Sequence, residues 1–414
     1  DGVVGGTAAL KSLNASGNRV DIEKNVTTNG SAGVVVSANS IRIGDDDLTN
    51  GSGAVTIDSE TGNGTVSMST SYLYLDDNVT FKRGTGAVTL GTYVFSQTDE
   101  RNDLSFTGSN GGAVHAGSFL GGSGATPSTK LGDITVASGT DFNVDYAISA
   151  ASLTAVNNTG RINLGNADYA QYYDGALGLN VRTTGTANNY GGDESITLGS
   201  NVVLSNAAAP LSVEATNGAL TIYRDLTTAG GDVSLKAGGG ALTLDYYTSI
   251  ATSGGDINLT GSGVSQSTTD DVLNAGTGQI RIDGGGAGVD IRSRIITTYD
   301  EAAGNGTPAV LVNNATGVTV RSVEAQKGSF QVGIVAGIDA LGATQSGSSA
   351  LTLLRENLRL RTAQALTLTS AAGSDNAAVT FTIVGTDATG NVVTEQVTGP
   401  ADGATVTTTN NNWI

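Results

Sequence analysis

A chain of 414 residues with 60 glycines, four prolines and no cysteine cannot contain a disulfide framework, a thiolate metal site or a cysteine nucleophile. Its hydrophobic fraction of 38% is too high for a disordered chain, and its glycine content is too high for a helical bundle. The formal net charge of −18 is unfavourable for nucleic-acid binding, and no apolar run is long enough to cross a bilayer.

Strand signals begin early in the chain. Starts of the form Gly-x-Val-x-apolar occur at 53–57, 64–68 and 86–90, and a Gly-Asp pair precedes an apolar strand at 132–136. Valine, isoleucine, leucine and alanine stand singly between threonine, serine, asparagine and glycine, a pattern typical of half-buried strands separated by turns. We therefore predict an all-β protein.

The clearest internal repeat lies between residues 196 and 259, with a period of 22 to 24 residues. Pairs of apolar residues two positions apart recur with Thr, Ser or Asn between them, which is the alternation of a strand with one face buried. The copies align in four columns: Ile196, Leu220 and Leu242; Leu198, Ile222 and Leu244; Leu211, Val233 and Ile257; Val213, Leu235 and Leu259.

A repeat of this length with two or three short strands matches one coil of a parallel β-helix. Propeller blades need roughly 40 or more residues, and no helical periodicity separates the strands. Stacked coils would bury a continuous core that one coil cannot bury alone. The segments 97–128, 166–192 and 298–308 fit no coil, and we predict that they are inserted loops.

The pattern changes near residue 350. Residues 351–361 combine leucines with arginines, as in a short helix or a charged strand at the solenoid end. Residues 379–384 and 392–398 alternate around an Asp/Gly/Asn turn, which predicts an antiparallel hairpin. We expect residues 1–350 to form a parallel β-solenoid, and residues 351–414 a small antiparallel β domain that caps it or docks onto a neighbour.

Stretches such as 228–235 and 253–259, together with 7–13, resemble the repeats of filamentous-haemagglutinin-type bacterial surface adhesins. The resemblance covers most of residues 1–345 and rests on composition and short strand motifs. It implies a right-handed parallel β-helix, export to the cell surface, and a role in adhesion or in an extracellular layer or filament. It brings no catalytic residues.

A second resemblance concerns residues 381–391, Phe-Thr-Ile-Val-Gly-Thr-Asp-Ala-Thr-Gly-Asn, with Thr394-Glu395 and Thr398-Gly399-Pro400 after them. This segment is similar to one in bacteriophage virion proteins. Tail fibres also use β-helices, so a tail fibre or other virion structural protein is the alternative function.

Aspartate runs follow two of the predicted strands, as Asp45-Asp46-Asp47 and Asp76-Asp77. Oxygen-rich turns suit Ca²⁺, which takes about six to eight oxygen ligands. Asp45 and Asp47 are therefore the candidate metal ligands, and calcium is the candidate cofactor. Solvated turn carboxylates are the alternative interpretation, because the tandem calcium-binding nonapeptide is absent.

Catalytic chemistry finds little support. His115 is the only histidine and supports no Ser/His/Asp arrangement by itself, so we predict no catalytic residues. A polysaccharide-active enzyme would need clustered acids, for which Asp225 and Asp245 with Tyr246 and Tyr247 are candidates; exposed polar positions are the alternative. One tyrosine group could form a sugar-stacking platform or simply pack an insert onto the solenoid: Tyr169, Tyr172, Tyr173 and Tyr190.

These patterns predict a non-enzymatic structural or adhesive protein outside the cell, as a subunit or fragment of a large repetitive adhesin, filament or surface layer. The expected location is the bacterial cell surface, with the virion as the alternative. We expect self-association, because solenoid ends expose open strand edges, and a glycan or other cell-surface ligand. Nucleic acid and membrane insertion are not expected.

Overall fold

The structure is a computed structural model, and it describes the chain outside residues 1–7, 46–52, 98–99, 109–110, 122–128, 138, 166–168, 185–193, 246, 305, 335–364, 366, 370–376, 378–379, 388–390 and 411–414. Within the described residues the chain consists of strands and turns, with no helix. The predicted all-β class is confirmed. The chain divides into two compact units, Asp1–Gly231 and Asp232–Ile414, and each is described by itself.

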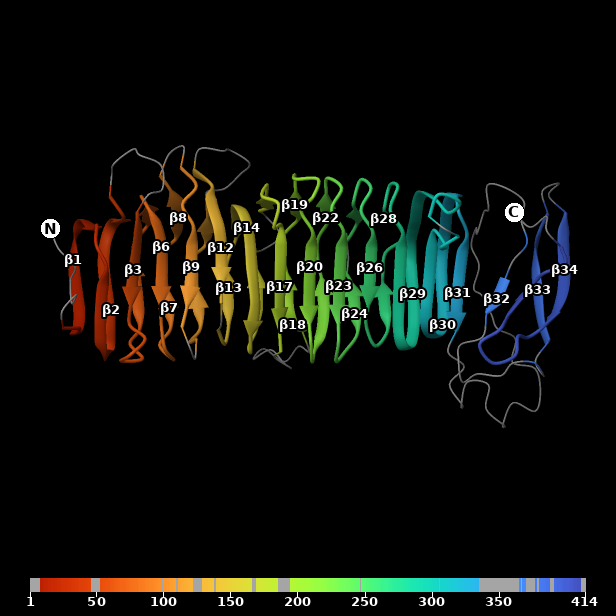
Figure 1. Ribbon diagram of the computed structural model, residues 1–414, viewed down its shortest axis with the longest axis horizontal. Coiled ribbons are helices and arrows are strands. Elements are labelled where there is room, and N and C mark those ends of the chain that lie inside the picture. The colour runs from red at the N-terminus through yellow and green to blue at the C-terminus, as the bar shows by residue number, and fades with distance from the viewer. Residues whose placement is uncertain are drawn as a thin grey trace. The chain divides into compact units, whose positions relative to one another are not determined.

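Each coil of the first unit has three strand positions, and successive coils pair in parallel (Figure 1). We name the three stacks of strands face A, face B and face C. β1 (Leu10–Ile22) and β2 (Val26–Ile43) each run through several positions of one coil and pair with each other in parallel.

Face A continues from the start of β2 through β3 (Ala54–Asp58), β6 (Asn78–Lys82), β9 (Leu104–Thr107), β12 (Leu131–Val136), the later part of β14 (Ala147–Asn158), β17 (Leu179–Thr183) and β20 (Leu211–Ala215). Face B continues from the middle of β2 through β4 (Val66–Ser69), β7 (Val88–Thr89), β10 (Val114–His115), β13 (Phe142–Val144), β15 (Ile162–Leu164), β18 (Glu194–Leu198) and β21 (Ala219–Ile222). Face C continues from the end of β2 through β5 (Tyr72–Leu75), β8 (Tyr93–Ser96), β11 (Phe119–Leu120), the start of β14, β16 (Gln171–Tyr173), β19 (Val202–Leu204) and β22 (Leu226–Thr228).

The second unit has the same three strand positions in each coil. Face A contains β23 (Val233–Ala237), β26 (Ile257–Thr260), the starts of β29 (Ile280–Asp300) and β30 (Val310–Lys327), and β31 (Phe330–Ile334). Face B contains β24 (Leu242–Leu244), β27 (Val264–Gln266) and the middles of β29 and β30. Face C contains β25 (Ile250–Ala251), β28 (Val272–Asn274) and the ends of β29 and β30. Both units are therefore parallel β-solenoids, as predicted.

The core consists of side chains stacked one coil above the next. On face A, Ile57 pairs with Phe81 and Phe81 with Phe106, and all three side chains are fully buried. Their neighbours Thr56 and Thr80 point outward and are partly exposed. Because successive strand side chains point to opposite faces, single apolar residues between polar ones are enough to build this core.

The repeat columns predicted within each unit are confirmed. Ile196 pairs with Leu220 in the first unit, and Leu235 pairs with Leu259 in the second. The number of residues between paired positions of neighbouring coils varies more than predicted. Val136 pairs with Ala155, which is closer in sequence than the predicted period, whereas Val181 pairs with Val213, which is farther away. The pairing of strands between coils is therefore regular, while the turns that connect the strands differ in length from coil to coil.

The prediction of inserted loops is wrong for parts of the three segments. Within 97–128 lie β9, β10 and β11; within 166–192 lie β16 and β17; and β29 extends to Asp300. The physical reason is visible in β16, where Gln171 and Tyr173 are fully buried core positions. Tyr173 Oη donates to Gln171 Oε1 at 2.8 Å, and Gln171 Nε2 donates to the Leu164 carbonyl at 2.9 Å. Polar residues that bond to each other inside the core conceal the apolar alternation.

A guanidinium also lies inside the first solenoid. The Arg83 side chain is fully buried and donates to the carbonyl oxygens of Thr107 at 3.3 Å and Gly112 at 3.4 Å. Burial lowers the pKa of Arg83 to about 10. Glycine provides the room, because a Cβ on Gly139 would lie 3.1 Å from Arg83 Nη2.

The C-terminal hairpin is confirmed. β33 (Thr380–Thr386) pairs antiparallel with β34 (Val392–Thr398), and the Asn391 amide donates to Asp387 Oδ1 at 2.9 Å in the turn. A second antiparallel pair joins β32 (Thr367–Thr369) to β35 (Thr405–Thr407). The predicted boundary at 350/351 and the leucine–arginine segment 351–361 lie outside the described residues.

Candidate functional site

The outward side of face C contains a group of aromatic residues. Tyr72 and Tyr74 alternate with the buried Leu73 and Leu75 on β5, so both tyrosines point away from the core. On the next coil β8 repeats the pattern, with Tyr72 paired to Tyr93 and Tyr74 to Phe95. Parallel register thus places aromatic side chains directly above one another.

The rings form a continuous series, which we call the aromatic row: Tyr72, Tyr74, Tyr93, Phe95, Phe119, Tyr146 and Tyr169. The ring centroids of Tyr72 and Tyr93 are 5.6 Å apart, and the two ring planes are nearly parallel. Those of Tyr93 and Phe119 are 4.8 Å apart with 9° between the planes. Tyr72 is 44% exposed and Tyr169 38%, whereas Phe119 is only 6% exposed.

Polar side chains lie beside the later part of the row. Asp145, the residue before Tyr146, accepts a hydrogen bond from Ser118 Oγ at 3.1 Å, and His115 Nε2 lies 3.2 Å from the same carboxylate oxygen, Oδ2. In a hydrolase triad the serine bonds to the histidine. Here Ser118 donates to the carboxylate instead, so the contacts orient Asp145 and do not activate a serine.

Arg42 lies at the other end of the row. It donates to both carboxylate oxygens of the buried Asp76, at 2.7 and 2.9 Å, and its guanidinium carbon lies 5.8 Å from the centre of the Tyr74 ring. A shallow hollow there is lined by Arg19, Ser40, Arg42 and Tyr74.

The predicted calcium ligands are only partly described. Asp45 is exposed, and its amide donates to Asp77 Oδ2 at 3.0 Å; Asp47 lies outside the described residues. Across the described residues no group of three or more His, Cys, Asp or Glu side chains is arranged to hold a metal ion. Calcium at Asp45 and Asp47 stays a prediction.

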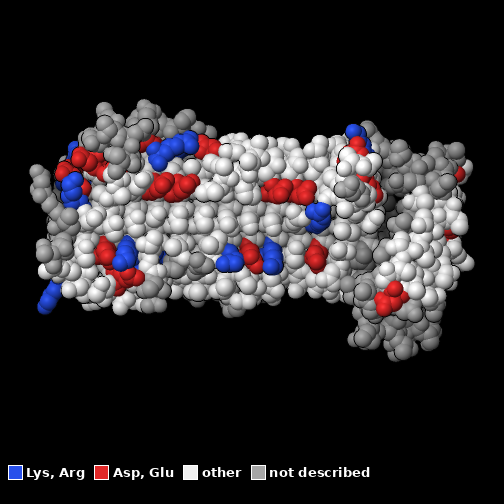
Figure 2. Space-filling model, in the orientation of Figure 1, with Lys and Arg blue, Asp and Glu red and all other residues white. Residues whose placement is uncertain are grey.

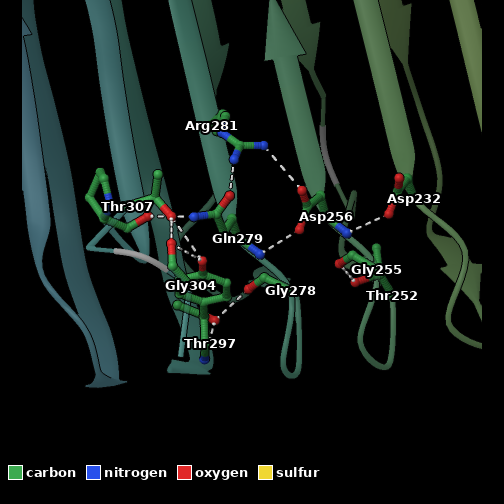
Figure 3. A network of polar contacts seen from close by, with 12 residues as sticks. Asp232, Thr252, Gly255, Asp256, Gly278, Gln279, Arg281, Thr297, Gly304 and Thr307 are labelled. Carbon is green, nitrogen blue, oxygen red and sulfur yellow. Dashed lines mark hydrogen bonds and ion pairs between the residues drawn. The ribbon is translucent and has the colours of Figure 1, made fainter. Parts of the chain in front are cut away.

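The Gly-Asp pairs before strands of face A have a structural use. Asp232 Oδ1 accepts the Asp256 amide, and Asp256 Oδ1 accepts the Gln279 amide, both at 2.8 Å (Figure 3). Arg281 Nη1 donates to the other Asp256 oxygen at 3.1 Å. Each carboxylate therefore bonds to the backbone of the next coil. The face shown in Figure 2 has acidic side chains in short rows with basic ones nearby, so its charge is mixed.

The structure does not bring the tyrosines of the predicted sugar-stacking platform together on one surface. Tyr173 is fully buried, Tyr172 is partly exposed on face C, and Tyr190 lies outside the described residues. Among the described tyrosines of this group, Tyr169 joins the aromatic row, where it contacts the buried Phe119 and the exposed Tyr146. The proposed acid cluster is not assembled within one unit, since Asp225 and Asp245 belong to different units and Tyr246 is not described.

Sequence reasoning singled out only Tyr169 of the aromatic row and missed its other members: Tyr72, Tyr74, Tyr93, Phe95, Phe119 and Tyr146. A signal for Tyr93 and Phe95 exists, because Tyr-Val-Phe at 93–95 repeats the apolar alternation of Tyr-Leu-Tyr at 72–74. Comparison with protein-family models, characterised proteins and solved structures finds no match to this chain. Among the described residues, no helix has the length and apolar character needed to cross a bilayer.

Proposed function

We propose that this chain is a structural and adhesive module of an extracellular surface protein, as a subunit or fragment of a larger adhesin, filament or surface layer. The observation that carries the proposal is the aromatic row, a partly exposed aromatic group on a regular solenoid face. Clustered apolar groups on a protein surface mark interaction sites, and stacked repeats offer extended binding surfaces.

The polar groups beside the row favour binding over catalysis. Ser118 and His115 both contact Asp145, and face A carboxylates such as Asp256 bond to backbone amides of the next coil. These side chains stabilise the solenoid and its surface. Self-association through open strand edges belongs to the same proposal.

The location can be tested by immunogold electron microscopy on the cells that produce the protein, with an antibody raised against the solenoid. The proposal predicts label on the outer surface, in a layer or on filaments, and no label on cells in which the gene is deleted. Label on virions would support the tail-fibre alternative. Label confined to the cell interior would contradict both.

A further inference from the structure

Tyr169 is oriented differently from the other rings of the aromatic row. Both faces of Phe119 are occupied, one by Tyr93 at 4.8 Å and 9° and the other by Tyr146 at 5.1 Å and 26°. Tyr169 therefore meets the edge of Phe119, with centroids 5.0 Å apart and planes at 89°. At this separation a perpendicular pair has the edge of one ring directed at the face of the other.

It follows that the edge of the Phe119 ring is directed at a face of Tyr169. Its plane is also steeply inclined to Tyr146, at 66° and 5.5 Å. One face of Tyr169 covers Phe119, which explains why Phe119 is 6% exposed while Tyr169 is 38% exposed. Because Phe119 occupies one face of Tyr169, the exposed part of Tyr169 lies on its other face or its edge.

Hydrogen-bonding groups lie next to the rings that Tyr169 covers. Ser118 and Asp145 directly precede Phe119 and Tyr146 in the sequence. The Asp145 carboxylate is held by Ser118 Oγ at 3.1 Å and His115 Nε2 at 3.2 Å, yet its side chain remains 40% exposed and that of His115 45%. Acceptor and donor capacity is thus left on Asp145 and His115, and Asp145 directly precedes Tyr146, whose ring contacts Tyr169.

We propose that Tyr169, with Asp145 and His115, binds a neutral pyranose unit of a polysaccharide. A pyranose combines an apolar C–H face, which packs on an aromatic ring, with a rim of hydroxyl groups, which bond to a carboxylate and an imidazole. Uronic and sialic acids fit poorly, because Asp145 and the net charge of −18 repel them. This assignment rests on the proposed adhesive function and supplies its ligand class.

The test uses the full chain in native affinity gels that contain dextran, mannan, laminarin or hydroxyethylcellulose, with alginate as the acidic polysaccharide. We expect retardation in at least one neutral gel and none in alginate. Tyr169→Ala should weaken binding about tenfold, the equivalent of about 1.4 kcal/mol, and Tyr169→Phe should stay within about twofold because it keeps the ring face.

The matched control is Tyr247→Asn. Tyr247 is the most exposed tyrosine among those described as exposed, at 71%, and asparagine tolerates its positive φ of 62°. This variant should bind like the unaltered protein, and circular dichroism should show all variants folded.

Three results would overturn the assignment. These are no retardation in any gel, retardation in alginate but in no neutral gel, or binding by Tyr169→Ala equal to that of the unaltered protein. If Tyr169→Ala instead abolishes concentration-dependent self-association in sedimentation velocity, the aromatic face contacts a second copy and not a sugar. Because the gels do not depend on where the protein resides, their failure would leave the immunogold result standing.

Discussion

Asp103 occupies a position on face A where side-chain oxygens accept amides of the next coil. Asn78 Oδ1 accepts the Asp103 amide, and Asp103 Oδ1 accepts the Asp133 amide, both at 2.7 Å. Burial raises the pKa of Asp103; the hydrogen bond from the Asp133 amide opposes this shift, and the negative charge of Asp133 adds to it. A raised folded pKa means that the contribution of Asp103 to stability is complete below its unfolded value and is lost as the pH rises through the folded pKa.

Asp103→Asn should therefore stabilise the protein at pH 7, by up to about 1 kcal/mol, because the amide keeps the acceptor oxygen and removes the charge. The gain should vanish below the ordinary carboxyl pKa of 3.8. Urea unfolding midpoints at pH 7 and pH 3 measure it, and Asn78→Asp, which adds a charge to the same row, should shift the midpoint the other way. An Asp103→Asn protein that is less stable at pH 7 would contradict this account.

Asp174 has the opposite electrostatic surroundings. Arg101 donates to both of its oxygens at 2.9 and 2.7 Å, and Lys130 Nζ donates at 3.0 Å. Burial by itself raises the pKa of Asp174, but the bonds from Arg101 and Lys130 outweigh burial and the pKa is lowered. Its stabilising contribution is thus present above the unfolded value of 3.8 and disappears as the pH falls through the lower folded pKa.

Asp174→Asn should cost about 1–3 kcal/mol at pH 7, because the Lys130 side chain, only 7% exposed, loses its charged acceptor. The difference from the unaltered protein should shrink as the pH falls below 3.8. Thermal unfolding from pH 3 to 8 records it. Asp290→Asn, which breaks the exposed pair with Arg292, is the control and should have little effect; equal losses in both variants would refute the argument.

At the scale of the strand, β16 shows that a solenoid core can contain a pair of buried polar side chains that bond to each other. Burial raises the pKa of Tyr173 well above its ordinary value, so the phenol stays neutral and donates to Gln171. Tyr173→Phe should lose about 1–3 kcal/mol, because it leaves the buried Gln171 Oε1 without that donor.

The double variant Gln171→Leu/Tyr173→Phe should recover part of this loss, because it removes both partners together. Chemical unfolding of the two single variants and the double variant measures the coupling. Strict additivity would show that the two side chains contribute independently, contrary to the contact described.

Strands with regular alternation could be predicted from the sequence, and those without it could not. Leu220 and Ile222 fell in the predicted register with Ile196 and Leu198, because each pair encloses one threonine. β11 has only two residues, too few to show a period. Phe119 and its contact with Tyr169 depend on the lengths of turns between coils, which no local pattern encodes. The aromatic row could therefore not be predicted from the sequence, except for the Tyr-x-aromatic pattern that two of its strands repeat.

At the scale of the whole molecule, the solenoid of each unit depends on parallel register between its coils and not on one compact core. Each coil buries its apolar side chains mainly against its neighbours, so stability is expected to be a sum of coil and interface contributions. An altered coil should weaken its neighbours most, and sites far along the solenoid least.

The most direct measurement of that register uses the absence of cysteine from the chain. Thr80 pairs with Ser105 on the next coil, and Ser105 pairs with Thr135 on the one after. Adjacent strands lie about 4.8 Å apart, which is within the Cα separation of about 4.4–6.8 Å that a disulfide accepts. Thr80→Cys/Ser105→Cys should therefore form an intramolecular disulfide under mild oxidation, as mass spectrometry of the non-reduced protein would show, and Thr80→Cys/Thr135→Cys, two coils apart, should not. Cross-linking of the second pair but not the first would mean that the coils are not stacked as described.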